Sequence, residues 1–220
     1  MGDENIEMKT RKQELLKKAK DNISTTLFDP INDVNLFSIL GMEHKEVSAH
    51  SAFLYYIFNP FYKHGIANKV EVDDLNIREL YKLIKNKNQN VQYPREPKYI
   101  NLSREVSFSY GRLDFLIVYS DDKGEKEDAI IIELKIWAGE QPYQLERYKK
   151  YLADNGYSED NIYFLTPTAR EATTADNVVN ITLTKDIIPV LENVCKQRKE
   201  SVPYVIVIKQ YIDIVIRITK

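Results

Sequence analysis

The chain has 220 residues, 43% of them hydrophobic and 29% charged, a length and balance that fit one globular domain and exclude a disordered or fibrous protein. A single cysteine, Cys195, excludes an intramolecular disulfide, and the lack of an apolar run of about 18 residues predicts no membrane span, so we expect a cytoplasmic protein. The net charge of -2 is evidence against a protein that coats nucleic acid indiscriminately, because such binding depends on lysine and arginine side chains that neutralise phosphates.

The first half of the chain has the composition of helices joined by loops. Helix-forming residues without Gly or Pro fill the first helix, whereas Gly41 and Asn59-Pro60 end two of the others. A polar, proline-containing stretch through Lys98 then predicts a surface loop. The predicted helices cover residues 5–22, Asp33–Leu40, Glu43–Phe58 and a part of Asn68–Lys87.

Strand character begins near Arg104, where β-branched and aromatic residues become frequent. Tyr110-Gly111 predicts a hairpin between the first two strands, and Ser120–Glu127 is a polar turn before the third. The predicted strands are Glu105–Ser109, Arg112–Tyr119, Asp128–Ile136, Asn161–Thr166 and Val178–Leu183.

Three segments of the second half are candidates for helices. Gln141–Ala153 has helical composition with Pro142 in its first turn, and Thr184 is placed to cap a helix that runs to about Lys199. The tail, Tyr204–Thr219, is open, because its polar residues recur at helical spacing while its isoleucines alternate as they would in a strand. Periodicity does not decide between the two.

The strand predicted at Asp128–Ile136 carries two charged residues where packing alone would favour hydrophobic ones. Side chains alternate along a strand, so Glu133 and Lys135 continue the face of Ala129 and Ile131. Both faces begin apolar, as in a central strand with layers on either side, and charges in such positions rarely lack a partner. The opposite face consists of Ile130, Ile132, Leu134 and Ile136.

The preceding strand has the same anomaly at Asp114, so two carboxylates and an amine can converge between neighbouring strands. Carboxylate oxygens are the ligands that Mg²⁺ prefers, and the ion takes only one or two from protein, which leaves positions for water and phosphate. A lysine beside that water can orient it or stabilise the charge that develops on the phosphate. Asp114 is expected on the face of Leu116 and Val118, with Leu113, Phe115 and Ile117 opposite.

Glu46 is a candidate for a third carboxylate. It lies one turn before His50 on the edge of the apolar stripe of the helix Glu43–Phe58, from which it could reach the same cleft. A glutamate in the first turn of a helix is also favoured by the helix dipole alone. The sequence supports both interpretations equally.

An amide and a phenol follow the charged strand. Gln144 and Tyr148 share one face of the next helix at a spacing of four residues and could orient the lysine, a water molecule or a phosphate oxygen. An ordinary buried salt bridge between Lys135 and either Glu133 or Asp114 is the alternative explanation for the charges.

Asp114 and, with eighteen residues between, Glu133-Leu134-Lys135 resemble the signature of the PD-(D/E)XK nuclease superfamily, which includes restriction endonucleases and recombination nucleases. Longer segments look like a little-characterised prokaryotic and phage branch of it. These segments are Gly111–Asp114, Ile131–Gln141, Gln144-x-x-x-Tyr148 and the upstream Glu46-x-x-x-His50-Ser51.

The resemblance implies an α/β fold like that of restriction endonucleases, with an αβββαβ core, a mixed central sheet flanked by helices and an N-terminal helical region. It also implies Mg²⁺, with Mn²⁺ as a substitute, held by Asp114, Glu133 and the main-chain carbonyl of Leu134. Glu46 would contribute directly or through water, and Lys135 would stand at the nucleophile.

The resemblance also bears on the organisation of the chain. Gln210-Tyr211 looks like part of the family's closing helix, which favours a helix for the tail. We expect a single domain over residues 1–220, with an N-terminal helical extension (1–42), the core (43–183) and C-terminal helices (184–220). The apolar segment Tyr204–Ile218 could serve a homodimer interface or cover the sheet within one chain.

The resulting hypothesis is a cytoplasmic, Mg²⁺-dependent nuclease that binds nucleic acid and hydrolyses phosphodiester bonds, with DNA as the preferred substrate. Two alternatives stay open: a catalytically silent module that kept the fold for binding or regulation, and an RNA-directed defence or toxin nuclease. Superfamily membership does not fix the substrate, because function depends on the site and its surroundings.

Overall fold

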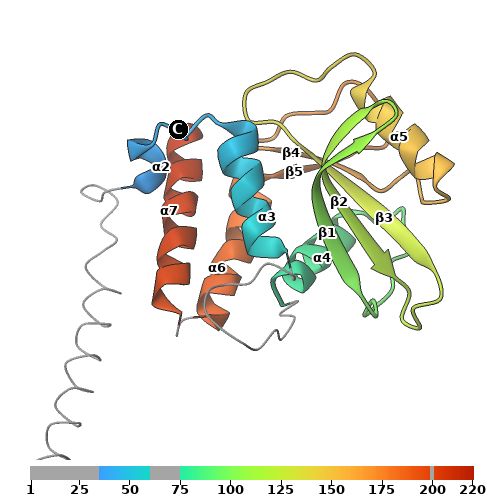
Figure 1. Ribbon diagram of the computed structural model, residues 1–220, viewed down its shortest axis with the longest axis horizontal. Coiled ribbons are helices and arrows are strands. Elements are labelled where there is room, and N and C mark those ends of the chain that lie inside the picture. Colours follow the sequence, from blue (N-terminus) through green and yellow to red (C-terminus); the bar gives the residue numbers. More distant parts are fainter. Residues whose placement is uncertain (1–34, 60–74, 199–200) are drawn as a thin grey trace, which may run out of the picture.

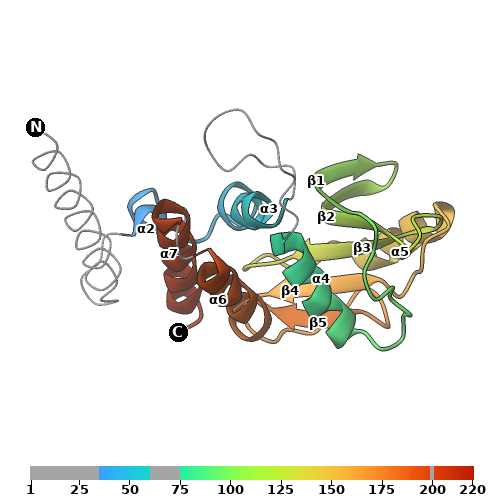
Figure 2. The same cartoon turned by 90° about the horizontal axis from the view of Figure 1, so that it is seen from below.

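A computed structural model describes residues 35–59, 75–198 and 201–220, and the helix predicted at 5–22 lies outside these ranges. A five-stranded sheet forms the centre of the fold, and helices cover both of its faces (Figures 1 and 2). The predicted α/β class is therefore confirmed.

Five strands make up the sheet: β1 (Ile100–Phe108), β2 (Gly111–Ser120), β3 (Glu127–Leu134), β4 (Ile162–Thr166) and β5 (Val179–Thr182). They lie in the order β1-β2-β3-β4-β5. The first three pair antiparallel, whereas β4 runs parallel to β3 and β5 parallel to β4. The sheet is thus mixed, and β3 has a partner on each edge.

Two strand boundaries differ from the predicted ones by more than one residue. β1 begins at Ile100 instead of near Arg104, because it continues its ladder as far as Tyr119 on β2. β3 ends at Leu134 instead of Ile136, so Lys135 lies where the chain leaves the sheet, although its N–H still donates to Leu165 O of β4 at 2.9 Å.

The helices are α2 (Leu36–Ile39), the π-helical turn η1 (Glu46–Ser51), α3 (Ala52–Phe58), α4 (Leu75–Lys87), α5 (Gln144–Asp154), the π-helical turn η2 (Leu183–Ile187), α6 (Ile188–Gln197) and α7 (Val202–Ile218). The expected αβββαβ order is present as α3, β1, β2, β3, α5 and β4, with α4 inserted before β1. The tail is a helix, as the resemblance favours.

The helix predicted from Glu43 begins only at Glu46. Gly41 has a φ of 61° and ends α2, and the chain stays extended at Lys45 with φ -88° and ψ 93°. The first turn is wider than an α-helix, since His50 N–H donates to Lys45 O five residues back at 3.2 Å. Such π-helical turns often occur at functional sites.

Two further helix starts were predicted at the wrong residue. Tyr143 has a left-handed backbone with φ 54°, so α5 begins at Gln144 and does not extend back through Pro142. Thr182, rather than Thr184, caps the helical segment that η2 opens, because its hydroxyl accepts from Lys185 N–H at 3.0 Å.

Two hydrophobic clusters hold the layers together, one on each face of the sheet. Figures 1 and 2 show α3, α4, α6 and α7 on one side and α5 on the other. Ile130 and Ile132 of β3 belong to the cluster under the first group, whereas Ala129 and Ile131 belong to the cluster under α5. The predicted alternation of β3 is therefore confirmed, and each fully buried isoleucine contributes about 1.5–3 kcal/mol to stability.

Leu113 is an exception to the predicted alternation of β2. It was expected on the face of Phe115 and Ile117, but it packs with Leu116 in the cluster under α5. The backbone of the paired strand is distorted at this point, where Glu105 has a φ of 54°, and such a distortion re-aims neighbouring side chains.

The apolar face of α7 is covered within the chain itself. Tyr204, Ile208, Tyr211 and Ile214 are buried in the larger cluster, where α7 packs against α2, α6 and η2, so the homodimer interface stays a prediction. Within the described ranges, no helix combines the length and the apolar composition needed to cross a bilayer.

Candidate active site

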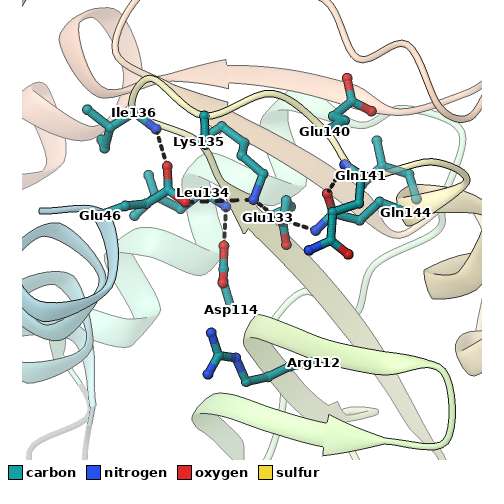
Figure 3. Close-up of polar contacts among 12 residues, drawn as sticks. Glu46, Arg112, Asp114, Glu133, Leu134, Lys135, Ile136, Glu140, Gln141 and Gln144 are labelled. Carbon is teal, nitrogen blue, oxygen red and sulfur yellow. Dashed lines mark hydrogen bonds and ion pairs between the residues drawn. The ribbon is translucent and has the colours of Figure 1, made fainter. Parts of the chain in front are cut away.

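The six predicted site residues lie together at the carboxyl end of β3, where η1, β2 and α5 meet, and Figure 3 labels all of them except the tyrosine of α5. Each is linked to another member of the group, or to the main chain between them, by a hydrogen bond or an ion pair. The six are Glu46, Asp114, Glu133, Lys135, Gln144 and Tyr148.

Asp114 is placed beside Glu133 by strand pairing. Phe115 pairs with Ile132, so Asp114, the preceding residue of β2, lies opposite Glu133, the following residue of β3. Asp114 is 9% exposed, and its Oδ2 accepts from Leu134 N–H at 2.9 Å. The carboxylate therefore fixes the end of β3 through Oδ2, while Oδ1 accepts no hydrogen bond from the described residues and can bind a ligand.

Glu133 is almost wholly buried, at 1% exposure, and is held from three sides. Its Oε1 accepts from Gln144 Nε2 at 2.6 Å and from Lys135 Nζ, and its Oε2 lies 2.8 Å from the hydroxyl of Tyr148. That hydroxyl also lies 2.9 Å from Arg112 O, and its single hydrogen serves one of the two acceptors. The predicted amide and phenol thus position a carboxylate.

Glu46 stands on the far side of Lys135. Its Oε1 lies 3.7 Å from Lys135 Nζ, and its Oε2 accepts from Ile136 N–H at 2.7 Å. Glu46 therefore ties the first turn of η1 to the segment that follows β3, and the lysine ammonium lies between two carboxylates (Figure 3).

Burial and mutual repulsion dominate the charge state of the carboxylates. Burial, reinforced by the negative charge of Glu133, raises the pKa of Asp114 to about 7, and the Leu134 N–H and Lys135 only partly oppose this. Burial lowers the pKa of Lys135, but the attraction of Glu133, Asp114 and Glu46 outweighs it, so the pKa is raised. Lys135 is therefore an ammonium group at neutral pH.

The donor set fits a hard divalent cation with few protein ligands. Asp114, Glu133 and the Leu134 carbonyl offer oxygen ligands only, as Mg²⁺ prefers. The pKa of Asp114 is high because two carboxylates share a low-dielectric environment. A bound cation would stabilise the charged form of both carboxylates. In the part of the chain that the structure describes, however, no three Asp, Glu, His or Cys side chains are grouped closely enough to enclose an ion.

His50 supports the turn that carries Glu46. The Nε2 of its buried ring lies 2.8 Å from Glu43 O, which can only accept, so this nitrogen carries the hydrogen and Nδ1 accepts from Tyr211 OH at 3.1 Å. Burial lowers the pKa of His50, which keeps the ring neutral. His50 is thus a structural link between η1 and α7.

Two charged residues at the site are not among those that the sequence predicts. Glu105 lies opposite Asp114 on β1, since Arg104 pairs with Phe115, and its Oε2 is 2.7 Å from Arg112 Nε. Arg112 could have been found from its position two residues before Asp114, where a regular strand would put both side chains on one side, although β2 departs from this alternation at Leu113. Glu105 could not, because its place depends on the register between β1 and β2.

Comparison with known proteins identifies the family of the chain. Searches for similar curated proteins and for similar solved structures found no match. The family model described as the PD-(D/E)XK nuclease superfamily matches residues 34–218, most of the chain. The chain therefore belongs to the PD-(D/E)XK nuclease superfamily.

Proposed function

We propose that this protein hydrolyses phosphodiester bonds of DNA with the help of Mg²⁺ held by Asp114, Glu133 and the carbonyl oxygen of Leu134. The observation that carries the proposal is the pair of buried carboxylates opposite each other on β2 and β3, with an ammonium group against one of them. Family membership makes a nuclease the first candidate, and DNA and Mg²⁺ are our own inference.

A bound divalent cation would act as a Lewis acid and lower the pKa of a coordinated water molecule. The chain's own residues prepare the rest of the site. Lys135, as an ammonium group, can hold an attacking water and stabilise negative charge on the phosphate. Gln144 and Tyr148 fix the orientation of Glu133, so its carboxylate does not have to reorganise when the substrate binds.

A substrate panel tests the proposal. We expect the purified protein to cleave plasmid, linear or single-stranded DNA in Mg²⁺ or Mn²⁺, and to lose all cleavage in a chelator, as measured on gels. Cleavage of RNA alone would replace DNA by RNA as the substrate. If none of these nucleic acids is cut with either metal, the proposed nuclease activity is wrong.

A catalytically silent module is the second candidate, and one observation favours it. Both oxygens of Glu133 are occupied by side chains of the protein itself, namely Lys135, Gln144 and Tyr148. Calorimetric titration with Mg²⁺ and Mn²⁺ separates the two candidates. If the protein is a nuclease, the wild type should bind the ion and the Asp114→Asn variant should not. If it is a silent module, neither the wild type nor the variant should bind the ion.

A further inference from the structure

We propose that Arg112 binds the phosphate of the substrate beside Asp114 and that Glu105 holds the arginine in position. The proposal rests on the proposed nuclease function and adds a residue that contacts the substrate. The two residues form an ion pair beside the carboxylates of the site.

The arginine is anchored at both ends. Its main-chain oxygen lies 2.9 Å from the hydroxyl of Tyr148, the residue that also reaches Glu133, and its Nε lies 2.7 Å from Glu105 Oε2. Figure 3 shows the guanidinium group directed toward Asp114. The side chain is nevertheless 54% exposed, so its terminal nitrogens can meet a ligand that approaches the site.

Glu105 occupies its place at a conformational cost. Its φ of 54° is unfavourable for a residue with a Cβ atom and interrupts an otherwise regular strand. Backbone strain of this kind concentrates at functional sites. Both carboxylate oxygens are shielded from solvent and accept no hydrogen bond from the described residues, so Arg112 is the cation that compensates their charge.

The charge balance of the site calls for a second cation. Glu105, Asp114 and Glu133 occupy neighbouring positions across β1, β2 and β3, and Glu46 adds a further carboxylate near Lys135. A phosphodiester anion would be repelled by these groups unless cations face it. Lys135 lies between the carboxylates of Glu46 and Glu133, so Arg112 adds a second cationic side chain that can attract the phosphate.

The chemistry of the guanidinium group fits this role. Arginine presents several N–H donors in a planar fork that matches two oxygens of one phosphate. Glu105 forms an ion pair with Nε at 2.7 Å, and the two terminal nitrogens have no hydrogen-bond or ion-pair partner among the residues the structure describes. The ion pair thus restricts the rotamers of the arginine without using the donors that a phosphate needs.

Binding and cleavage by Arg112→Ala, Arg112→Lys and Glu105→Gln test the proposal. We expect Arg112→Ala to weaken binding of a fluorescein-labelled DNA oligonucleotide in EDTA by about 10-fold, measured by anisotropy, and to lower the slope of log K against log salt by about 0.7–0.9. Arg112→Lys should recover part of the affinity, because it keeps the charge but loses the fork. Glu105→Gln should raise KM more than it lowers kcat.

Arg217→Ala is the matched control, because Arg217 Nε pairs with Asp213 at 2.8 Å on α7 and contacts none of the site residues. It should bind and cleave as the wild type does. If Arg112→Ala, folded as judged by its melting curve, keeps the wild-type affinity and salt slope, the proposal is wrong. Failure of the nuclease function itself would appear separately, as a wild type that binds the oligonucleotide but cleaves nothing.

A separate observation concerns Trp137, the only tryptophan of the chain. We infer, again on the basis of the proposed function, that its ring stacks on an unpaired base of the substrate. Trp137 follows Lys135 by two residues and is 58% exposed, although large aromatic side chains are usually mostly buried. Base stacking on exposed aromatic rings is a common way to hold single-stranded nucleic acid.

The ring is fixed by the two segments that carry the site. Its Nε1–H donates to His44 Nδ1 at 2.8 Å, and the two rings meet edge to face with centroids 5.9 Å apart. His44 precedes Glu46 by two residues, and Ile136, next to Trp137, donates its N–H to Glu46. A ring held in this way loses little conformational freedom when a base stacks on it.

Fluorescence of this single tryptophan gives a direct test in EDTA, where no cleavage is expected. We expect oligo(dT) to quench the emission and a blunt duplex of equal length to quench it much less. Trp137→Leu should weaken oligo(dT) binding by about 10-fold and Trp137→Phe much less, since stacking contributes about 1–3 kcal/mol per base.

Tyr99→Leu provides the control, because Tyr99 is 39% exposed at the opposite end of the sheet, just before β1. It should bind oligo(dT) as the wild type does. Anisotropy that reports oligo(dT) binding without any quenching, or unchanged binding by Trp137→Leu, would refute the stacking role while leaving the nuclease function untouched.

Discussion

Replacing Lys135 with methionine is expected to lower the single-turnover rate of DNA cleavage by about 10²–10³-fold, the usual effect of removing one charged or hydrogen-bonding group that stabilises a transition state. The ammonium group lies against Glu133, and its pKa is raised by the surrounding carboxylates in spite of burial. It therefore stays charged at neutral pH, and methionine keeps an unbranched side chain as far as the ε-carbon but not the charged nitrogen. Quenched-flow or gel assays at saturating enzyme measure the effect.

The same substitution also removes the counter-charge of a buried carboxylate. Glu133 keeps its bonds from Gln144 and Tyr148, so we expect a loss of up to about 3 kcal/mol in the free energy of unfolding rather than failure to fold. Lys82→Met is the matched control, because Lys82 pairs with Glu79 at 2.7 Å on the surface of α4. It should change neither quantity measurably. Cleavage at the wild-type rate by a folded Lys135→Met protein would remove the lysine from the chemistry.

The strands that carry the site could be predicted from the sequence because their pattern is local. β3 alternates between two buried faces, and Glu133 and Lys135 are unusual only against that background. Asp114 follows from the same argument on β2. Hydrophobic alternation therefore identifies charged residues inside a core, and the side chains that approach each other follow from strand pairing.

Features that depend on long-range packing or on local strain could not be predicted. The left-handed backbone of Glu105 and Tyr143 leaves no signal in the sequence, because neither residue type favours it. Leu113 lies under α5 beside the distorted backbone at Glu105, and Glu105 meets Arg112 only through the register of β1 with β2. The tail was ambiguous for a different reason: isoleucine favours strands locally, and packing of α7 within the chain overrides that preference.

Replacing Asp114 with asparagine is expected to abolish metal binding and, in a chelator, to make the protein more stable than the wild type at pH 8. The pKa of Asp114 in the folded protein is raised from about 4 to about 7 by burial and by Glu133. The folded state thus binds a proton that the unfolded state has released between these values. The stabilising contribution of protonated Asp114 is complete below about pH 4 and is lost as the pH rises through about 7.

The size of this effect can be estimated from the shift. Between pH 5 and pH 8 the wild type should lose about 2–3 kcal/mol of unfolding free energy through Asp114, at about 1.4 kcal/mol per pH unit up to the folded pKa. The side chain of asparagine does not titrate, and its amide oxygen can still accept the hydrogen bond from Leu134 N–H. The variant should therefore lack this part of the pH dependence. Urea denaturation at both pH values in EDTA measures the difference.

Addition of Mg²⁺ or Mn²⁺ at pH 8 should reverse the order of stability. A cation that binds only the folded wild type stabilises it by mass action, whereas the asparagine variant gains nothing. Two results would contradict the assignment of Asp114: equal pH dependence of the two proteins in EDTA, or equal stabilisation of both by the metal. Either would mean that Asp114 is a structural bond to the end of β3 and that the cation, if one binds, is held elsewhere.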